Sequence, residues 1–157
     1  MTEGYKNVAD ELATKPTSMC YTSGYSMYPL LRDHKDIAVI GRLTRELKVN
    51  DVPLYRKRGF KQLVLHRIVK IKCDGSLVIR GDNTYKNEFD ISREDITGVL
   101  VGFYRNGRYI DCERSRAYLI YICLMRMFYP IRWTWHKAII PTLSKIKRFI
   151  LKRIKHA

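Results

Sequence analysis

Three short segments of the sequence carry the residue types of a hydrolytic site. Ser26 lies between a glycine and a proline in the segment 23–30, His66 follows about forty residues later in an apolar, β-branched run, and Asp82 lies in a Gly-Asp-Asn turn. A serine hydroxyl needs a base within hydrogen-bond reach, an imidazole accepts a proton near neutral pH, and a carboxylate orients that imidazole. Together these residues predict nucleophilic hydrolysis by a Ser-His-Asp site.

Each of these residues, taken alone, has a simpler interpretation. A serine in a Gly/Pro segment is most often a turn residue, a histidine on a strand is most often a packed residue, and an aspartate in Gly-Asp-Asn is typical of an Asx turn. The hydrolytic hypothesis therefore depends on the three segments occurring together, each at the edge of a strand-like run.

The chain around these segments predicts a mainly β domain. Short β-like runs separated by turn signals follow one another without long helices between them, which indicates a small antiparallel sheet of coiled or barrel-like form. A short helix over 2–14 is expected to precede the sheet. The expected strands are 17–22, 37–40, 49–55, 63–72, 76–80, 96–104 and 108–112, with a turn over 56–60 and a polar loop over 84–95.

The charge divides the sequence into two parts. The net charge is +15, and eleven Lys and Arg residues but no acidic residue follow Glu113. Such a basic segment favours anionic partners, either lipid headgroups or nucleic acid. The distribution predicts a catalytic β domain over 1–113 and a basic helical tail over 114–157.

Two helices are expected in this tail. The apolar run 117–129 is too short and too interrupted for a spanning helix, which needs about 20 apolar residues, and Pro130 is expected to break or kink it. The segment 141–157 predicts a basic amphipathic helix, and Trp133 and Trp135 are residue types that favour a headgroup boundary. The tail is therefore expected to associate with an anionic membrane surface.

The alternative for the tail is a helical hairpin packed on the β domain. Nucleic-acid binding is not expected, because the sequence contains no nucleic-acid-binding signature besides the positive charge.

The cysteines and the N-terminus indicate the compartment. Four widely spaced cysteines form neither a CxxC pair nor a zinc-ligand cluster, so we expect reduced thiols and neither a metal nor another cofactor. The N-terminus lacks the apolar segment of a secretory signal, which predicts a catalytic domain on the cytoplasmic side of the membrane. The cysteines are Cys20, Cys73, Cys112 and Cys123.

The order of these segments resembles the signal peptidase superfamily of serine peptidases, which includes the self-cleaving SOS repressors. The family's Ser-Met-x-Pro nucleophile box, the His-Arg-Ile box of its histidine branch, its Gly-Asp-Asn box and its closing Ile-x-Gly strand are matched by 26–29, 66–69, 81–83 and 96–100. The resemblance spans residues 20–104 and implies a signal-peptidase-type β fold without a cofactor.

The resemblance also implies roles for individual residues. Ser26 would be the nucleophile and His66 the general base, and the backbone N–H of Ser26 would donate to the oxyanion. The Ser23 hydroxyl is a second candidate donor, although its spacing differs from the family's by one residue. Met27 and Pro29 belong to the same box and would shape the oxyanion and substrate-binding segment.

The acid of the triad has two candidates. Asp82 lies in the Gly-Asp-Asn box, but in the histidine branch an aspartate several residues further on can complete the triad, and here that residue is Asp90. The two aspartates remain alternatives at this point.

The activity implied by the resemblance is that of a serine endopeptidase that cleaves a leader-bearing peptide or preprotein at a membrane surface. The chain departs from membrane signal peptidases because only about twenty polar residues precede its nucleophile box. The alternatives are a catalytically silent peptide-binding or regulatory module of the same fold and a self-cleaving regulator.

Overall fold

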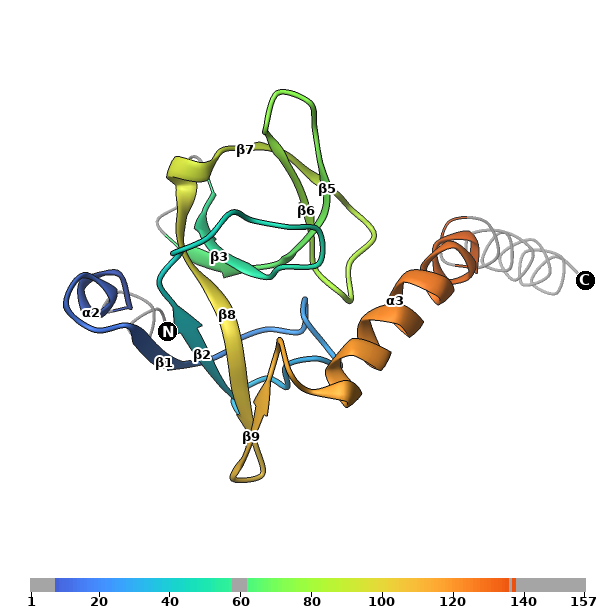
Figure 1. The fold of residues 1–157 in the computed structure, drawn as a ribbon. Coiled ribbons are helices and arrows are strands. Elements are labelled where there is room, and N and C mark those ends of the chain that lie inside the picture. Colours follow the sequence, from blue (N-terminus) through green and yellow to red (C-terminus); the bar gives the residue numbers. More distant parts are fainter. Residues whose placement is uncertain (1–7, 58–61, 136, 138–157) are drawn as a thin grey trace, which may run out of the picture. The chain divides into compact units, whose positions relative to one another are not determined.

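The computed structural model describes residues 8–57, 62–135 and 137, which form a mainly β protein. The strands are β1 (Thr17–Tyr21), β2 (Ile37–Gly41), β3 (Pro53–Arg56), β4 (Leu63–Leu65), β5 (Arg67–Ile71), β6 (Leu77–Arg80), β7 (Glu88–Ile91), β8 (Ile96–Arg105) and β9 (Arg108–Asp111). The helices are α2 (Val8–Thr14), the short 3-10 helix η1 (Arg93–Asp95) and α3 (Arg116–Thr134). Figure 1 shows their arrangement.

The strands form two antiparallel sheets. The larger has the order β1-β2-β8-β3-β4, with β9 paired to β8, and the smaller has the order β5-β6-β7. The larger sheet curls into a half-barrel, which agrees with the expected coiled form. In Figure 1 the smaller sheet lies on the opposite side of β3 from β1, β2 and β9.

A core between β3 and the smaller sheet holds these two sheets together. Tyr55 of β3 and Ile68 of β5 are fully buried, and they pack with Leu77 and Ile79 of β6 and Ile91 of β7. Burial of such side chains contributes about 1.5–3 kcal/mol each. The core thereby fixes the end of β3 against β5 and β7, where the candidate site lies.

Two predictions about the strands are wrong. The run 63–72 is not one strand: β4 pairs with β3, β5 pairs with β6, and the chain changes sheets at His66. A continuous β-branched run does not indicate that its two halves pair with strands of different sheets. The segment 84–95 is not a loop, because it contains β7 and η1. Its mostly polar composition did not indicate that Ile91 is buried in the core.

The helices agree in part with expectation. The helix expected over 2–14 is present as α2 from Val8 onward, and residues 2–7 lie outside the described residues. Pro130 does not break the apolar helix, because α3 continues through it to Thr134. A proline removes one backbone hydrogen bond, and the remaining bonds of a long helix can outweigh that loss. Most of the turn expected over 56–60, and the helix expected over 141–157, also lie outside the described residues.

The chain divides into two compact units, Met1–Leu119 and Ile120–Ala157. The division falls inside α3, so the first turn of this helix belongs to the β unit. Tyr118 in that turn is buried and bonds to Arg67 through its hydroxyl, at 3.1 Å.

Candidate active site

Ser26 lies in the loop between β1 and β2, and hydrogen bonds hold this loop in place. The backbone N–H of Asn83 donates to the Ser26 carbonyl at 2.7 Å, and the Asn83 side-chain amide donates to the Tyr25 carbonyl at 3.2 Å. The Gly24 N–H donates to the Asp33 carboxylate at 2.8 Å. The Gly-Asp-Asn turn and the nucleophile segment, matched separately in the sequence, are therefore in direct contact.

A buried carboxylate fixes the other end of the same loop. Asp36 is fully buried and accepts hydrogen bonds from Arg32 and Arg105, and Arg105 also donates to the carbonyls of Pro29 and Leu30. Burial alone would raise the pKa of Asp36, but the hydrogen bonds from Arg105 and Arg32 outweigh burial and lower this pKa. The carboxylate stays ionised and ties the loop to the end of β8.

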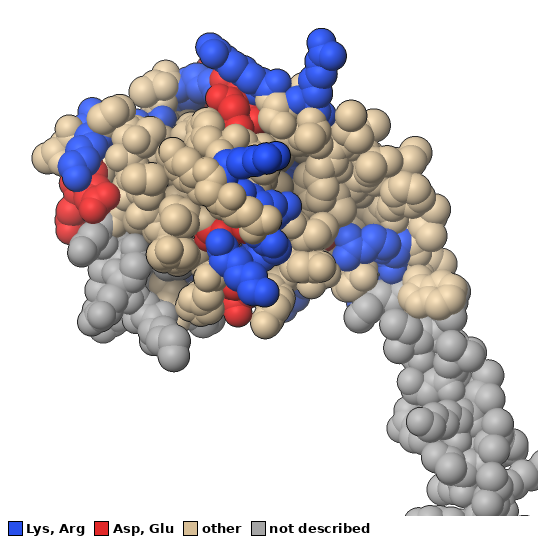
Figure 2. Space-filling view, turned by 90° about the horizontal axis from the view of Figure 1, so that it is seen from below, with Lys and Arg blue, Asp and Glu red and all other residues tan. Residues whose placement is uncertain are grey.

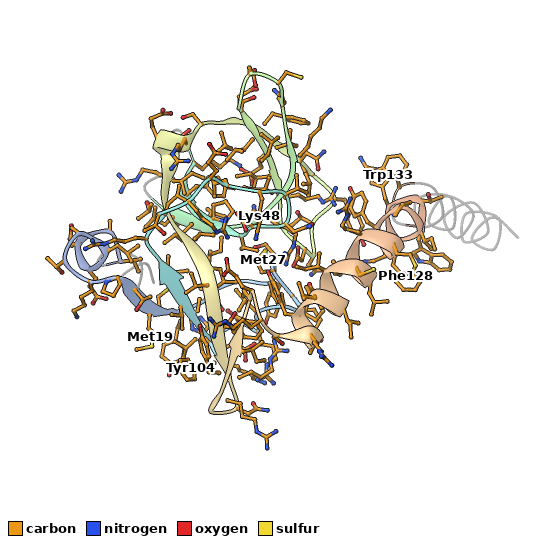
Figure 3. The ribbon with its side chains drawn as sticks, viewed as in Figure 1. Met19, Met27, Lys48, Tyr104, Phe128 and Trp133 are labelled. Atoms are coloured by element: carbon orange, nitrogen blue, oxygen red, sulfur yellow. The ribbon has the colours of Figure 1, made fainter. Side chains whose placement is uncertain are left out.

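The remaining residues predicted around Ser26 differ in exposure. Ser23 and Pro29 are exposed, whereas Met27 is only 5% exposed and lies near the centre of the domain (Figure 3). Met27 therefore anchors the loop by packing, and the exposed surface beside Ser26 is formed by its neighbours. Among these, Tyr25 and Tyr28 are exposed.

His66 lies where the chain passes from the larger sheet to the smaller one, between Leu65 of β4 and Arg67 of β5. Its ring is largely buried, and its Nδ1 atom is 3.2 Å from Oε1 of Glu88 and 3.2 Å from the hydroxyl of Tyr55. Burial lowers the pKa of His66, although the Glu88 carboxylate opposes this effect. The imidazole is therefore neutral at pH 7 and can accept a proton.

The other edge of the imidazole faces the Gly-Asp-Asn turn. A Cβ atom on Gly81 would lie 3.0 Å from Nε2 of His66 and 2.6 Å from the Ser26 carbonyl oxygen. Any side chain at this position would push the Ser26 segment or the imidazole away. The glycine thus leaves room for the Ser26 carbonyl and the Nε2 edge of His66 beside the same backbone position.

The two predicted acids occupy different places. Asp82 is buried, and its two oxygens accept hydrogen bonds from Nε and Nη2 of Arg67, each at 2.7 Å. The side chain of Asp90 is 76% exposed and pairs with Lys72 at 2.7 Å. The carboxylate that the structure brings to Nδ1 of His66 belongs to neither aspartate but to Glu88.

Glu88, Tyr55 and Lys57 are the residues near His66 that the sequence alone did not single out. Glu88 lies in β7, within the segment expected to be a loop, and pairs in register with Ile79 of β6. Lys57 follows β3, and its Nζ lies 2.8 Å from Oε2 of Glu88. The alternation of apolar and polar residues in Glu-Phe-Asp-Ile was the available signal for β7.

The cysteines are not among the groups that surround the His66 ring. All four are free, as expected, and burial raises the pKa of the Cys20 thiol to about 11 and that of Cys112 to about 12. Within residues 8–57, 62–135 and 137, no cluster of His, Cys, Asp or Glu side chains has the arrangement of a metal site. None of the helices described there is both long and apolar enough to cross a membrane.

Comparison of the chain with known protein families, with characterised proteins and with solved structures finds no match.

Proposed function

We propose that the protein is a serine endopeptidase in which Ser26 is the nucleophile and His66 the general base. The observation that carries this proposal is the placement of the His66 ring: Nδ1 lies 3.2 Å from the Glu88 carboxylate, and Nε2 and the Ser26 carbonyl oxygen both border Gly81. A neutral imidazole held at Nδ1 presents Nε2 as a proton acceptor on the side of the serine.

The reaction follows the acyl-transfer sequence that this arrangement favours. The Ser26 hydroxyl attacks the scissile carbonyl carbon while Nε2 of His66 takes the hydroxyl proton. The imidazolium then gives this proton to the leaving amine, and water, activated by the same imidazole, hydrolyses the acyl-enzyme. The backbone N–H of Ser26 is the proposed donor to the oxyanion.

The proposed substrate is an extended peptide, such as a leader sequence. β4 is an edge strand of the larger sheet and ends at Leu65, directly before His66. A peptide that pairs with β4 would add a strand to the sheet, and main-chain hydrogen bonds would set its register relative to the site. Such a peptide would bring one carbonyl group to Ser26.

The experiment that tests this function is labelling of the full chain with a fluorophosphonate, followed by mass mapping of the modified residue. We expect one adduct, on Ser26, because only a serine beside a general base reacts rapidly with this reagent. Ser92→Ala is the matched control, since Ser92 is a partly exposed serine outside this loop, at the start of η1, and it should label normally. An adduct on another residue, or none in the wild type, would rule out the proposal.

We further propose that α3 attaches the protein to an anionic membrane. Five of its exposed apolar side chains recur at three- and four-residue spacing and therefore share one side of the helix, whereas the exposed Leu119 and Trp133 lie off this side. The charge favours the same partner: Figure 2 shows more Lys and Arg than Asp and Glu surface on the face that it draws. The five side chains on this side are Ile120, Leu124, Met127, Phe128 and Ile131.

Vesicle flotation tests this attachment in the full chain. The double substitution Leu124→Asp and Ile131→Asp is expected to lower binding to vesicles with anionic lipid at least about tenfold, because each buried apolar side chain contributes about 1.5–3 kcal/mol. Substitution of two residues outside the helix, Lys70→Gln and Lys86→Gln, is the control for loss of charge alone. Binding that persists in the double variant would instead favour the helical-hairpin alternative.

A further inference from the structure

We infer that Glu88 is the positioning carboxylate of His66, and that Tyr55 and Lys57 hold Glu88 in this role. The inference rests on the proposed Ser26–His66 chemistry and adds to it the residue that orients the base.

The contact between Glu88 and His66 is short and shielded. Oε1 of Glu88 is 3.2 Å from Nδ1, and the two side chains are only 16% and 10% exposed. An interaction between a carboxylate and an imidazole is stronger in such surroundings than in bulk water. The three groups come from different elements, with Tyr55 on β3, His66 after β4 and Glu88 on β7, so the fold determines their arrangement.

The donors in this cluster determine which ring nitrogen carries the proton. Nδ1 of His66 lies 3.2 Å from both Oε1 of Glu88 and the Tyr55 hydroxyl. An ionised carboxylate only accepts hydrogen bonds, so its proximity favours the tautomer with the proton on Nδ1. Burial raises the pKa of Tyr55, and its hydroxyl therefore remains a donor that also bonds to Glu88. With its single proton on Nδ1, the neutral imidazole keeps Nε2 as the acceptor at the Ser26 side.

Lys57 keeps Glu88 ionised. Its Nζ lies 2.8 Å from Oε2, the carboxylate oxygen that is not next to His66. Burial alone would raise the pKa of Glu88, but Lys57 and the neighbouring His66 and Tyr55 side chains outweigh burial and lower it. Glu88 thus bonds to the imidazole through one oxygen and to a cation through the other.

Glu88 and Lys57 act on the imidazole in opposite directions. The negative charge of Glu88 favours the imidazolium and raises the pKa of His66, whereas the positive charge of Lys57 lowers it. Asp82, on the far side of the ring, also raises this pKa, but its charge is balanced by Arg67. These three charged groups, together with the neutral Tyr55 hydroxyl, face His66.

The test measures the rate of fluorophosphonate labelling of Ser26 against pH in the full chain. Glu88→Gln is expected to lower the plateau rate about 100-fold and to move the acid limb of the profile to lower pH, because removal of the carboxylate charge lowers the pKa of His66. Lys57→Met is expected to move the same limb to higher pH. Glu94→Gln, an exposed Glu→Gln change in η1, is the matched control and should change neither the plateau rate of labelling nor the pH of the acid limb.

Two further measurements keep the test decisive. Imidazole ¹⁵N spectra, with His66 assigned by comparison with His66→Gln, should show the Nδ1-protonated tautomer in the wild type and its loss in Glu88→Gln. If Glu88→Gln fails to fold, Glu88→Asp replaces it and should lower the labelling rate by less, since it keeps the charge.

The outcomes separate this inference from the proposed function. If Ser26 is labelled in the wild type but Glu88→Gln changes neither the rate, the pH limb nor the tautomer, the function stands and the inference is overturned. A rate loss confined to Asp90→Asn would also overturn it. Absence of any label on wild-type Ser26 would overturn both.

Discussion

Replacement of Ser26 by alanine is expected to lower the kcat of peptide cleavage about 10³- to 10⁶-fold, with no loss of fold. The hydroxyl is the proposed nucleophile, and without it the proposed acyl-enzyme on residue 26 cannot form. Ser26 is only half-buried, and the loop that carries it is held through backbone and neighbouring groups, which alanine leaves intact. The thermal midpoint should therefore remain close to that of the wild type.

The single and double variants of Ser26 and His66 give the sharpest form of this prediction. Residues that act as one catalytic unit show strongly non-additive losses. We expect His66→Ala to cost nearly as much as Ser26→Ala, and the double variant to cost little more than either alone. The measurement is cleavage of a fluorogenic peptide library from which wild-type substrates are first selected.

Two results would contradict the assignment. Cleavage retained in Ser26→Ala would show that another residue is the nucleophile. Binding of library peptides by the wild type without cleavage of any of them would favour the alternative of a peptide-binding or regulatory module. Cleavage of the chain itself, lost in the same variant, would instead identify a self-cleaving regulator.

The largest effect on stability is expected at Asp82. Asp82→Asn leaves the guanidinium of Arg67 buried without its counter-charge, and breaking a buried ion pair in this way costs about 3–5 kcal/mol of the free energy of unfolding. Both side chains are less than a tenth exposed, and the two hydrogen bonds between them are 2.7 Å long. Burial alone would lower the pKa of Arg67, but Asp82 outweighs burial and raises it in the wild type. Arg67 also stays charged in the variant, because a guanidinium does not lose its proton in proteins.

Urea unfolding of matched variants checks this expectation. Asp90→Asn makes the same chemical change at an exposed site paired with Lys72, where surface pairing contributes little, and should leave the midpoint nearly unchanged. The double variant Arg67→Met and Asp82→Leu removes both charges and should recover much of the loss. Equal midpoints for Asp82→Asn and Asp90→Asn would show that the buried pair does not brace the domain.

The sequence predicted the parts of the site that depend on local pattern. The loop of Ser26, the strand-like surroundings of His66 and the turn at Gly81 are each visible within a few residues of sequence. The resemblance only implied that these segments lie together. In the structure, the Ser26 carbonyl accepts a hydrogen bond from the Asn83 N–H of the Gly-Asp-Asn turn.

The remaining parts depend on contacts between distant residues. Glu88 lies in a short, mostly exposed strand whose polar composition is typical of a loop, and its role arises only when β7 pairs with β6. Arg105 bonds to Asp36 across 69 positions of sequence, and no local pattern indicates that pair. Composition likewise did not show that the chain changes sheets at His66, because both strands around it have the same β-branched character.

The position of β8 has a consequence for the order in which a new chain becomes active. β8 pairs with both β2 and β3, and Arg105 at its end holds the Pro29 and Leu30 carbonyls. A ribosome makes Ser26 and His66 well before residue 105, and contacts so distant in sequence form late in folding. The segments of Ser26 and His66 therefore reach their final arrangement only after β8 is complete, and we expect the proposed peptidase activity to begin only then.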